Sequence, residues 1–242
     1  MTKSLAPENW DQAKKILVIL AHPDDPEFFC GATLARWVDA GHEVNYLLLT
    51  RGDKGSNDPL TNPGDLMSLR MIEQRAAADV LGVKEVTFLS YLDGYVIPDL
   101  EMRKEVVRHI RRLKPDIIVT SDPQNYYNRG LYINHSDHRA AGQVTIEAVF
   151  PAAGNLFYFP ELLQEGLTPH TPVEVWVSLT HEPNVAIDIT PFWQIKLNAL
   201  LKHKSQVGDP ANFLDKMASR KTEDSTLDAP RYEESFRRLY QR

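Results

Sequence analysis

The feature that most constrains the fold is a continuous apolar run at residues 16–21, ILVILA, which ends directly at a histidine and a proline. A strand with one face in water alternates apolar and polar side chains, so this unbroken run predicts a strand buried on both faces. Strands of this kind belong to parallel sheets that helices cover on both sides. We therefore begin from a layered α/β arrangement.

After this run the chain alternates between apolar strands and segments with helical apolar spacing. We expect strands at residues 43–50, 85–90, 116–121, 173–179 and 185–189, and helices at 28–40, 66–81, 100–113 and 191–203. The rhythm predicts an α/β, Rossmann-like fold with a mostly parallel sheet and helices on both faces. In the strand order of a Rossmann-like sheet, the strands at 16–21 and 116–121 are neighbours, and ligands bind in the crevice at their carboxyl ends. A functional site should therefore follow residues 21 and 121.

Composition excludes several classes of protein. Lys and Arg total 27 against 33 Asp and Glu, so a net charge of -6 gives no positive field for nucleic acid. No stretch approaches the roughly 18 to 20 apolar residues of a membrane span. The single cysteine, Cys30, cannot form an internal disulfide, which agrees with the cytoplasm. We expect a cytoplasmic protein without nucleic-acid or membrane partners, in which His and carboxylates hold any metal.

The first polar motif, AHPDDPE at residues 21–27, stands where a nucleotide-binding sheet would carry a glycine-rich turn. It places an imidazole and three carboxylates at the expected crevice, and its two prolines stiffen the turn. His22 and Asp25 can point at one ion while Asp24 faces elsewhere. The alternative interpretation is an acidic turn that caps the next helix.

The second polar motif, NHSDHRAAG at residues 134–142, follows the strand at 116–121. Its two histidines, at i and i+3, face the same side of one helical turn. Catalytic zinc commonly takes three His or carboxylate ligands and leaves a fourth position for water, so one of this pair would complete a set with His22 and Asp25. An isolated His-x-x-His is more often a surface or capping feature. The metal interpretation is favoured because both motifs fall in loops that the fold places side by side.

Together these motifs resemble the paired signatures of the PIG-L/LmbE-like family of zinc-dependent N-deacetylases. The resemblance extends to LLLTRGDKGS, YLDG and LLKHKSQ, and it covers roughly residues 16–207. We expect one domain over residues 1–242, with this core and a helical tail at 208–242.

The resemblance implies a division of labour within the motifs. It implies three metal ligands, His22, Asp25 and His138, for one Zn²⁺ ion per chain, and it leaves Asp24 as the general base. Zinc lowers the pKa of bound water toward about 7 and polarises a carbonyl group. Two imidazoles and a carboxylate also suit Fe²⁺, Co²⁺ or Mn²⁺.

By resemblance, His135 stabilises the oxyanion of the tetrahedral intermediate and Asp137 holds it in one orientation. Protonated, His135 would also assist the leaving amine. Asp137 has an alternative role as a structural helix cap. Two further residues stay open: Glu27 either orients a ligand or caps a helix, and His203 of the KHKSQ segment has no clear role.

Substrate-binding residues are expected at the same edge of the sheet. Five candidates are polar or aromatic residues of the surrounding loops: Arg51, Asp53, Asp93, Tyr127 and Arg129. The first three can bond sugar hydroxyls, and the aromatic loop at 122–133 can stack on a sugar ring. Solvated loop charge and ordinary packing are the alternatives.

We therefore expect a hydrolase that removes an N-acetyl group from an amino sugar or N-acetylglucosamine-type conjugate. Its partner would be a small N-acetylated sugar, and the resemblance implies a homo-oligomer, a trimer or hexamer. One alternative is a metal-binding, non-catalytic or regulatory protein on the same fold. A second is an oxidoreductase, which the missing glycine fingerprint disfavours.

Overall fold

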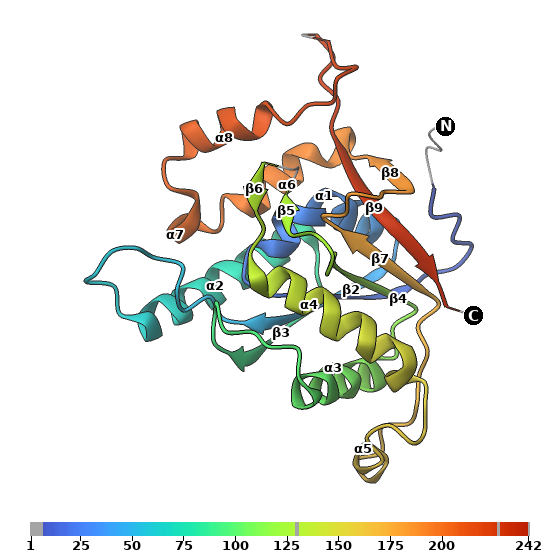
Figure 1. Cartoon of the computed structure of the whole chain (residues 1–242). Coiled ribbons are helices and arrows are strands. Elements are labelled where there is room, and N and C mark those ends of the chain that lie inside the picture. The colour runs from blue at the N-terminus through green and yellow to red at the C-terminus, as the bar shows by residue number, and fades with distance from the viewer. Residues whose placement is uncertain (1–6, 129–130, 227, 242) are drawn as a thin grey trace.

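The structure is a computed structural model that describes residues 7–128, 131–226 and 228–241. The strands of its central sheet lie in the order β3 (Glu85–Tyr91), β2 (Glu43–Thr50), β1 (Lys15–Leu20), β4 (Ile117–Ser121), β7 (Glu174–Ser178), β9 (Glu233–Tyr240) and β8 (Val185–Asp188) (Figure 1). The first five strands of that order are parallel, and β9 runs antiparallel to both of its neighbours. The predicted α/β, mostly parallel fold is confirmed.

Strand β1 shows why its sequence is apolar throughout. Ile16, Val18 and Leu20 belong to the core on one face of the sheet. Leu17 and Ile19 belong to the core on the opposite face. Because successive side chains of a strand point to opposite faces, a strand covered on both sides has no solvent-facing position.

Helices cover both faces of the sheet (Figure 1). One layer contains α1 (Asp25–Asp39), α2 (Pro63–Leu81) and α6 (Trp193–Leu200), and the other contains α3 (Leu100–Leu113), α4 (Ser136–Glu147) and a π-helical segment, η1 (Ala148–Ala153). The remaining elements are the strands β5 (Tyr127–Asn128) and β6 (Tyr132–Ile133), the helices α5 (Glu161–Gln164), α7 (Lys204–Val207) and α8 (Pro210–Ala218), and a 3-10 turn, η2 (Thr190–Phe192). Within the described residues, no helix is long and apolar enough to cross a membrane.

Local signals explain where α2 begins and ends. The Asn62 side chain accepts hydrogen bonds from the backbone N–H groups of Gly64 at 2.8 Å and Asp65 at 3.3 Å, which caps the amino end. Gly82 ends the helix in the left-handed conformation, with φ of 76°. A glycine adopts this conformation without the steric cost that a Cβ atom brings.

The expected helical tail at residues 208–242 is wrong for its second half. Helix α8 is present, but residues 233–240 form β9, which lies between β7 and β8. Phe236 is fully buried and its ring packs against Trp176 with centroids 5.5 Å apart. The many charged residues of EESFRRLY obscure its alternating strand pattern, and pairing with β7 and β8 determines that this segment forms a strand. That β9 is part of the central sheet supports the expectation of a single domain.

Candidate active site

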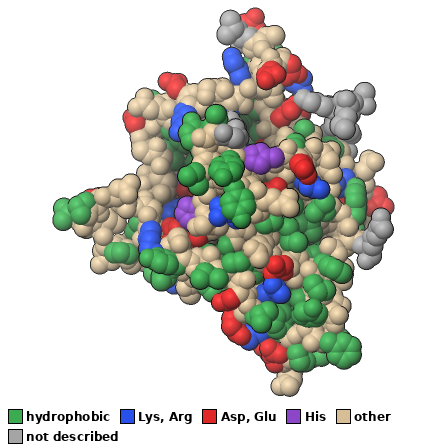
Figure 2. Space-filling model, in the orientation of Figure 1, with side chains coloured by type: hydrophobic (Ala, Val, Ile, Leu, Met, Phe, Trp, Pro, Cys, Tyr) green, Lys and Arg blue, Asp and Glu red, His purple; other side chains and the backbone are tan. Residues whose placement is uncertain are grey.

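The site lies at the carboxyl edge of the sheet, where β1 separates β2 on one side from β4 on the other. Connections leaving neighbouring strands diverge at such a position and leave a crevice for a ligand. The turn after β1 brings His22 to this edge, the loop after β3 brings Asp93, and the start of α4 brings His138. In Figure 2, histidine side chains reach the surface on the side where α4 and the β5–β6 hairpin lie.

The three predicted metal ligands converge. The His22 Nδ1 atom lies 3.3 Å from Asp25 Oδ2, and His138 Nε2 lies 3.1 Å from Asp25 Oδ1. One donor atom from each of the three residues falls within 4.8 Å of the other two. Asp25 and His22 are buried, while His138 is partly open to solvent. Two imidazole nitrogens and a carboxylate oxygen form a donor set that suits a divalent metal such as Zn²⁺.

Asn134, which the sequence interpretation gave no role, holds His138 in place. Its amide oxygen lies 2.9 Å from His138 Nδ1, so it accepts the Nδ1–H and leaves Nε2 free to bind a metal. The Asn134 amide nitrogen in turn donates to the Asn125 carbonyl at 2.8 Å. Its place four residues before His138 is the only sequence signal that points to this contact.

Asp137 contacts two histidines, the expected His135 and also His22. One of its oxygens lies 3.3 Å from His22 Nε2 and accepts the Gly94 N–H at 2.7 Å. Its other oxygen is 3.9 Å from His135 Nδ1, beyond hydrogen-bond distance. The backbone N–H of Asp137 donates to that Nδ1 at 3.2 Å instead. Asp137 therefore contacts His135 through its backbone N–H, while its carboxylate faces His22.

Asp93 joins the same cluster from the loop after β3. Its Oδ1 atom lies 3.2 Å from His22 Nε2 and 3.8 Å from His135 Nε2. His22, Asp93, His135 and Asp137 form a second group whose donor atoms lie within 4.8 Å of one another. His22 therefore stands between two sets of carboxylates, one on each ring nitrogen.

The buried carboxylates and imidazoles shift one another's pKa values. Burial raises the pKa of Asp25, but the charges of His138 and His22 outweigh it and hold that pKa well below its usual range. Burial lowers the pKa of His22, yet the Asp25 charge and the contacts with Asp137 and Asp93 hold it above its usual range. Burial likewise opposes ionisation of Asp93 and Asp137, and the bond from His22 still lowers both pKa values. The cluster is thus rich in ionised carboxylates, which favours a bound cation.

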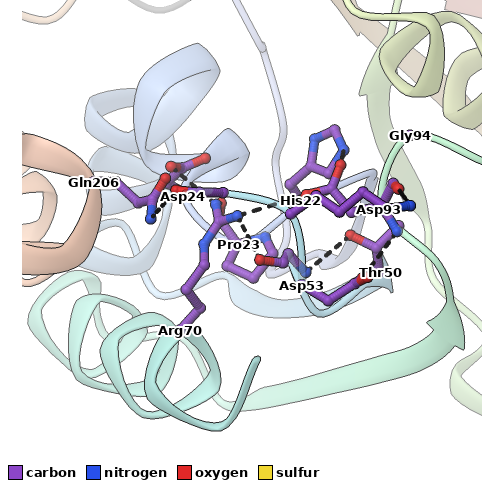
Figure 3. A network of polar contacts seen from close by, with 12 residues as sticks. His22, Pro23, Asp24, Thr50, Asp53, Arg70, Asp93, Gly94 and Gln206 are labelled. Carbon is purple, nitrogen blue, oxygen red and sulfur yellow. Dashed lines mark hydrogen bonds and ion pairs between the residues drawn. The ribbon is translucent and has the colours of Figure 1, made fainter. Parts of the chain in front are cut away.

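Asp24 lies beside this cluster but outside both groups of converging donors. It adopts a left-handed conformation, with φ of 85°, at the amino cap of α1. Arg70 of α2 reaches it with a contact of 3.2 Å between the guanidinium and Asp24 Oδ2 (Figure 3). Burial raises the pKa of Asp24 to about 6, against the opposing charge of Arg70. Asp24 is therefore a partly buried acidic residue whose carboxylate faces Arg70 and stands outside both groups of converging donors.

Arg70 is the main residue that sequence reasoning missed. It is only 4% exposed, and its guanidinium donates to the Pro23 carbonyl at 2.7 Å and the Gly52 carbonyl at 3.1 Å. It also lies 3.8 Å from Asp93 Oδ2. Within the helical pattern at 66–81 an arginine reads as a solvent-facing residue, and no sequence signal marks it as buried.

The structure brings two of the predicted substrate residues together and places the other described ones elsewhere. Asp53 and Asp93 lie together, since an Asp53 oxygen accepts the Asp93 N–H at 3.0 Å (Figure 3). Arg51 instead donates to the Leu89 carbonyl at 3.2 Å and to the Ser90 hydroxyl at 2.6 Å, which ties it to the end of β3. Tyr127 is 65% exposed on the β5–β6 hairpin, and Arg129 lies outside the described residues.

An α/β sheet with His and Asp donors at its crevice defines a protein with a metal site of the hydrolytic type. Comparisons with known proteins identify its family. The family model described as PIG-L: GlcNAc-PI de-N-acetylase matches residues 17–149. Diacetylchitobiose deacetylase of Thermococcus kodakarensis is 37% identical over 199 residues, which cover 82% of this chain and 72% of that protein. The chain belongs to the PIG-L family.

Further relatives agree with this assignment. A protein of Bacillus anthracis named probable N-acetyl-alpha-D-glucosaminyl L-malate deacetylase 2 is 25% identical, with 80% of this chain and 81% of that one covered. The solved structure of N,N'-diacetylchitobiose deacetylase from Pyrococcus horikoshii has a TM-score of 0.87 at 30% identity, covering 98% of this chain and 87% of that one. The predicted family, fold and deacetylase class are confirmed.

Proposed function

We propose that this chain is a Zn²⁺-dependent hydrolase that removes the N-acetyl group from the glucosamine unit of a small sugar conjugate. The observation that carries the proposal is the convergence of His22, Asp25 and His138, with the non-ligating Asp24 beside them. The names of the related proteins support an N-acetylated amino sugar as the substrate class.

The donor set fits one metal ion held by the two imidazoles and the Asp25 carboxylate. When bound, such an ion lowers the pKa of water and polarises the acetyl carbonyl. We propose Zn²⁺ as the native ion, and metal analysis of freshly purified protein distinguishes it from Fe²⁺, Co²⁺ and Mn²⁺.

The chain's own residues then have separate tasks. We assign Asp24 as the general base, because its carboxylate is not committed to a ligand position and can take the proton of the attacking water. Asp137 and Asp93 fix the orientation of His22 through its Nε2 atom.

His135 is assigned to the oxyanion. Its Nδ1 atom accepts the Asp137 N–H at 3.2 Å, so in the neutral ring the proton is on Nε2. Burial and the neighbouring His22 charge lower the pKa of His135, which favours this neutral form. A neutral Nε2–H that points into the cluster is a hydrogen-bond donor for developing negative charge, whereas the expected assistance to the leaving amine requires the protonated ring.

Sugar recognition is assigned to the loops at the same edge. We propose that Asp53 and Asp93 face the sugar hydroxyls and that Tyr127 offers an exposed ring on which the sugar stacks. Arg51 acts indirectly, through its bonds to the end of β3, and Arg129 stays a prediction.

The experiment is a panel of N-acetylated substrates assayed for free amine. It contains N,N'-diacetylchitobiose and the N-acetylglucosamine conjugates of malate and inositol, each with and without chelator. We expect amine release from at least one member, its loss on chelation and its recovery on adding Zn²⁺. An Asp24→Asn variant should bind metal normally and lose about 100-fold or more in kcat.

A protein that binds Zn²⁺ tightly but releases no amine from any member would overturn the proposal and favour the non-catalytic alternative. A fully active Asp24→Asn variant would overturn the assignment of the base alone. The cytoplasmic location, the absence of nucleic-acid and membrane partners, and assembly into a trimer or hexamer stay predictions, and the oligomer is tested by light scattering of the purified protein.

A further inference from the structure

Behind the HPDD turn a chain of buried polar side chains leads away from the metal ligands. Gln74 of α2, Glu27 of α1 and His203 at the start of α7 are all 0% exposed. Gln74 Oε1 accepts the backbone N–H of Asp24 at 2.7 Å, and Gln74 Nε2 donates to the two Glu27 oxygens at 3.0 and 3.1 Å. Glu27 Oε2 then lies 3.2 Å from His203 Nε2. Helix α1, helix α2 and the start of α7, which are distant in sequence, thus meet behind the peptide N–H of Asp24.

The contacts fix the orientation of the Gln74 amide. Its oxygen must face the Asp24 N–H, which only donates, and its nitrogen must face a carboxylate, which only accepts when ionised. A flipped amide would lose both interactions. Glu27 is in turn held by His203, so the Gln74 side chain has one arrangement in which every partner is satisfied.

The α7 side of this chain is itself anchored. Ser205 donates to Glu73 of α2 through its backbone N–H at 2.8 Å and its hydroxyl at 2.6 Å. Gln206 donates to the Gly55 carbonyl at 3.2 Å. The segment KHKSQ therefore packs against α2, the helix that carries Gln74, and against the loop that follows β2.

Asp24 needs such support because its backbone is unfavourable. A residue with a Cβ atom is sterically strained in the left-handed region and persists there only where its surroundings hold it. Asp24 has φ of 85°, and its side chain makes no capping hydrogen bond for α1. Gln74 bonds its N–H, while Arg70 bonds its carboxylate and the preceding carbonyl of Pro23. Without the Gln74 contact the peptide can relax, and the Asp24 carboxylate moves with it.

We propose that Gln74, held in place by Glu27 and His203, is a positioning residue that keeps Asp24 in its left-handed conformation for proton transfer. The inference rests on the proposed function, since it takes Asp24 as the general base. It gives Glu27 and His203 one shared role, as supports of an amide that touches neither substrate nor metal.

The test is a double-mutant cycle between Gln74→Met and Asp24→Asn, measured on the substrate that the panel identifies. Methionine has the shape of glutamine without its polar atoms. In the wild-type background we expect Gln74→Met to lower kcat about 10- to 100-fold with KM nearly unchanged, because the sugar contacts lie elsewhere. In the Asp24→Asn background the same change should lower kcat less than 3-fold, because groups that act as a unit are not additive.

Further variants separate positioning from loss of structure. Gln74→Glu keeps an acceptor for the Asp24 N–H but sets a second carboxylate against the Glu27 oxygens, so it should lose kcat as Gln74→Met does, and adding Glu27→Gln should restore part of that loss. Gln74→Asn, shorter by a methylene, cannot span both partners and gives the same split between kcat and KM if the methionine variant fails to fold. Val106→Ala removes fully buried apolar atoms from α3, away from the turn, and controls for lost stability alone.

The outcomes distinguish the two proposals. Equal loss of kcat from Gln74→Met in both backgrounds, or a fall in bound Zn²⁺ that accounts for the lost activity, would overturn the positioning role while leaving the deacetylase intact. An unchanged kcat in Gln74→Met would overturn it as well. A fully active Asp24→Asn variant would refute the base assignment, and with it this inference, whereas absence of any amine release would refute the proposed function.

Discussion

The molecule buries charged side chains in several places, and two of these places differ in how their charges are balanced. At the metal cluster, the carboxylates of Asp25, Asp93 and Asp137 surround histidines. At the junction of α6 and β9, Lys196 Nζ lies 2.6 Å from Glu234 Oε1, with both side chains about 5% exposed. The first site holds an excess of carboxylates, whereas the junction of α6 and β9 holds a matched pair, one carboxylate with one ammonium group.

The matched pair is also satisfied by backbone groups. Glu234 accepts the N–H groups of Ala32 at 3.3 Å and Thr33 at 2.8 Å, and Lys196 donates to the Phe28 carbonyl at 2.9 Å. These contacts tie the carboxyl-terminal strand to the middle of α1. Burial of charge therefore does not by itself indicate function, whereas buried charge that lacks a balancing partner does.

The largest expected effect breaks the metal cluster. Replacing Asp25 by Ala removes the carboxylate that both His22 and His138 face, so the two imidazoles lose their common partner. We expect metal affinity to fall by more than the roughly 10- to 100-fold that loss of a ligand's supporting residue costs, and amine release to fall below detection. Metal content after dialysis, measured beside the kcat, checks this. Wild-type metal content in the variant would contradict the ligand assignment.

The next effect breaks the matched pair. Lys196→Met leaves Glu234 buried without its cation, which should lower the free energy of unfolding by about 3 to 5 kcal/mol. Zn²⁺ content and KM should stay at wild-type values, because no contact of the pair reaches the metal ligands. Urea unfolding measures the first quantity, and the double variant Lys196→Met, Glu234→Gln should recover part of the loss. A parallel fall in metal affinity would show that the two regions are coupled through α1.

A smaller effect sharpens the role of the uncharged supports. Asn134→Ala removes the acceptor that holds His138 Nδ1, so metal affinity should fall about 10- to 100-fold with the ligands intact. Asn184→Ala is the matched control, since Asn184 also donates to a carbonyl, that of Arg238 at 2.9 Å, but at the β8–β9 end of the sheet. Competition with a chromogenic chelator measures both variants. Equal metal affinity in the two variants would contradict the role of Asn134 in holding His138.

The difference between the regions also explains what the sequence could predict. The apolar runs and helix periods predict the five parallel strands, β8, and helices α1, α2, α3 and α6, because a strand buried on both faces is apolar at almost every position. The two motifs predict His22, Asp25 and one histidine of the 134–142 motif as ligands, because a parallel sheet brings the ends of β1 and β4 together, and the family resemblance selects His138.

The residues that were missed owe their roles to tertiary contacts. Arg70 and Gln74 belong to a helical pattern in which polar residues are expected to face water, yet both are buried against the HPDD turn. Strand β9 falls in the segment expected as a helical tail, because its buried Glu234 needs Lys196, which is 38 residues away in the chain. No local window contains such pairings.

The smallest effect concerns a titratable group that belongs to neither region. Burial and then the charge of Arg112 lower the pKa of His109 on α3 to about 4, although Glu105 and Glu85 oppose the shift and Arg108 adds to it. On acidification, His109 in the folded state therefore takes up its proton at a lower pH than in the unfolded chain, where its pKa is near 6.5. Stability from this group is complete above that pH and is lost as the pH falls toward 4.

For wild-type protein we expect about 1 kcal/mol of this loss between pH 7 and pH 5, after allowance for partial exposure of the ring. His109→Gln should remove that part of the pH dependence, whereas Asp25, Asp93 and Asp137 contribute no acid loss in this range, because their lowered pKa values place their protonation below pH 5. Urea unfolding of both proteins at the two pH values, in the presence of chelator, measures the difference. An identical pH dependence in the variant would show that burial does not lower the pKa of His109. Its charged neighbours would then set its protonation state, as they do in the other two regions.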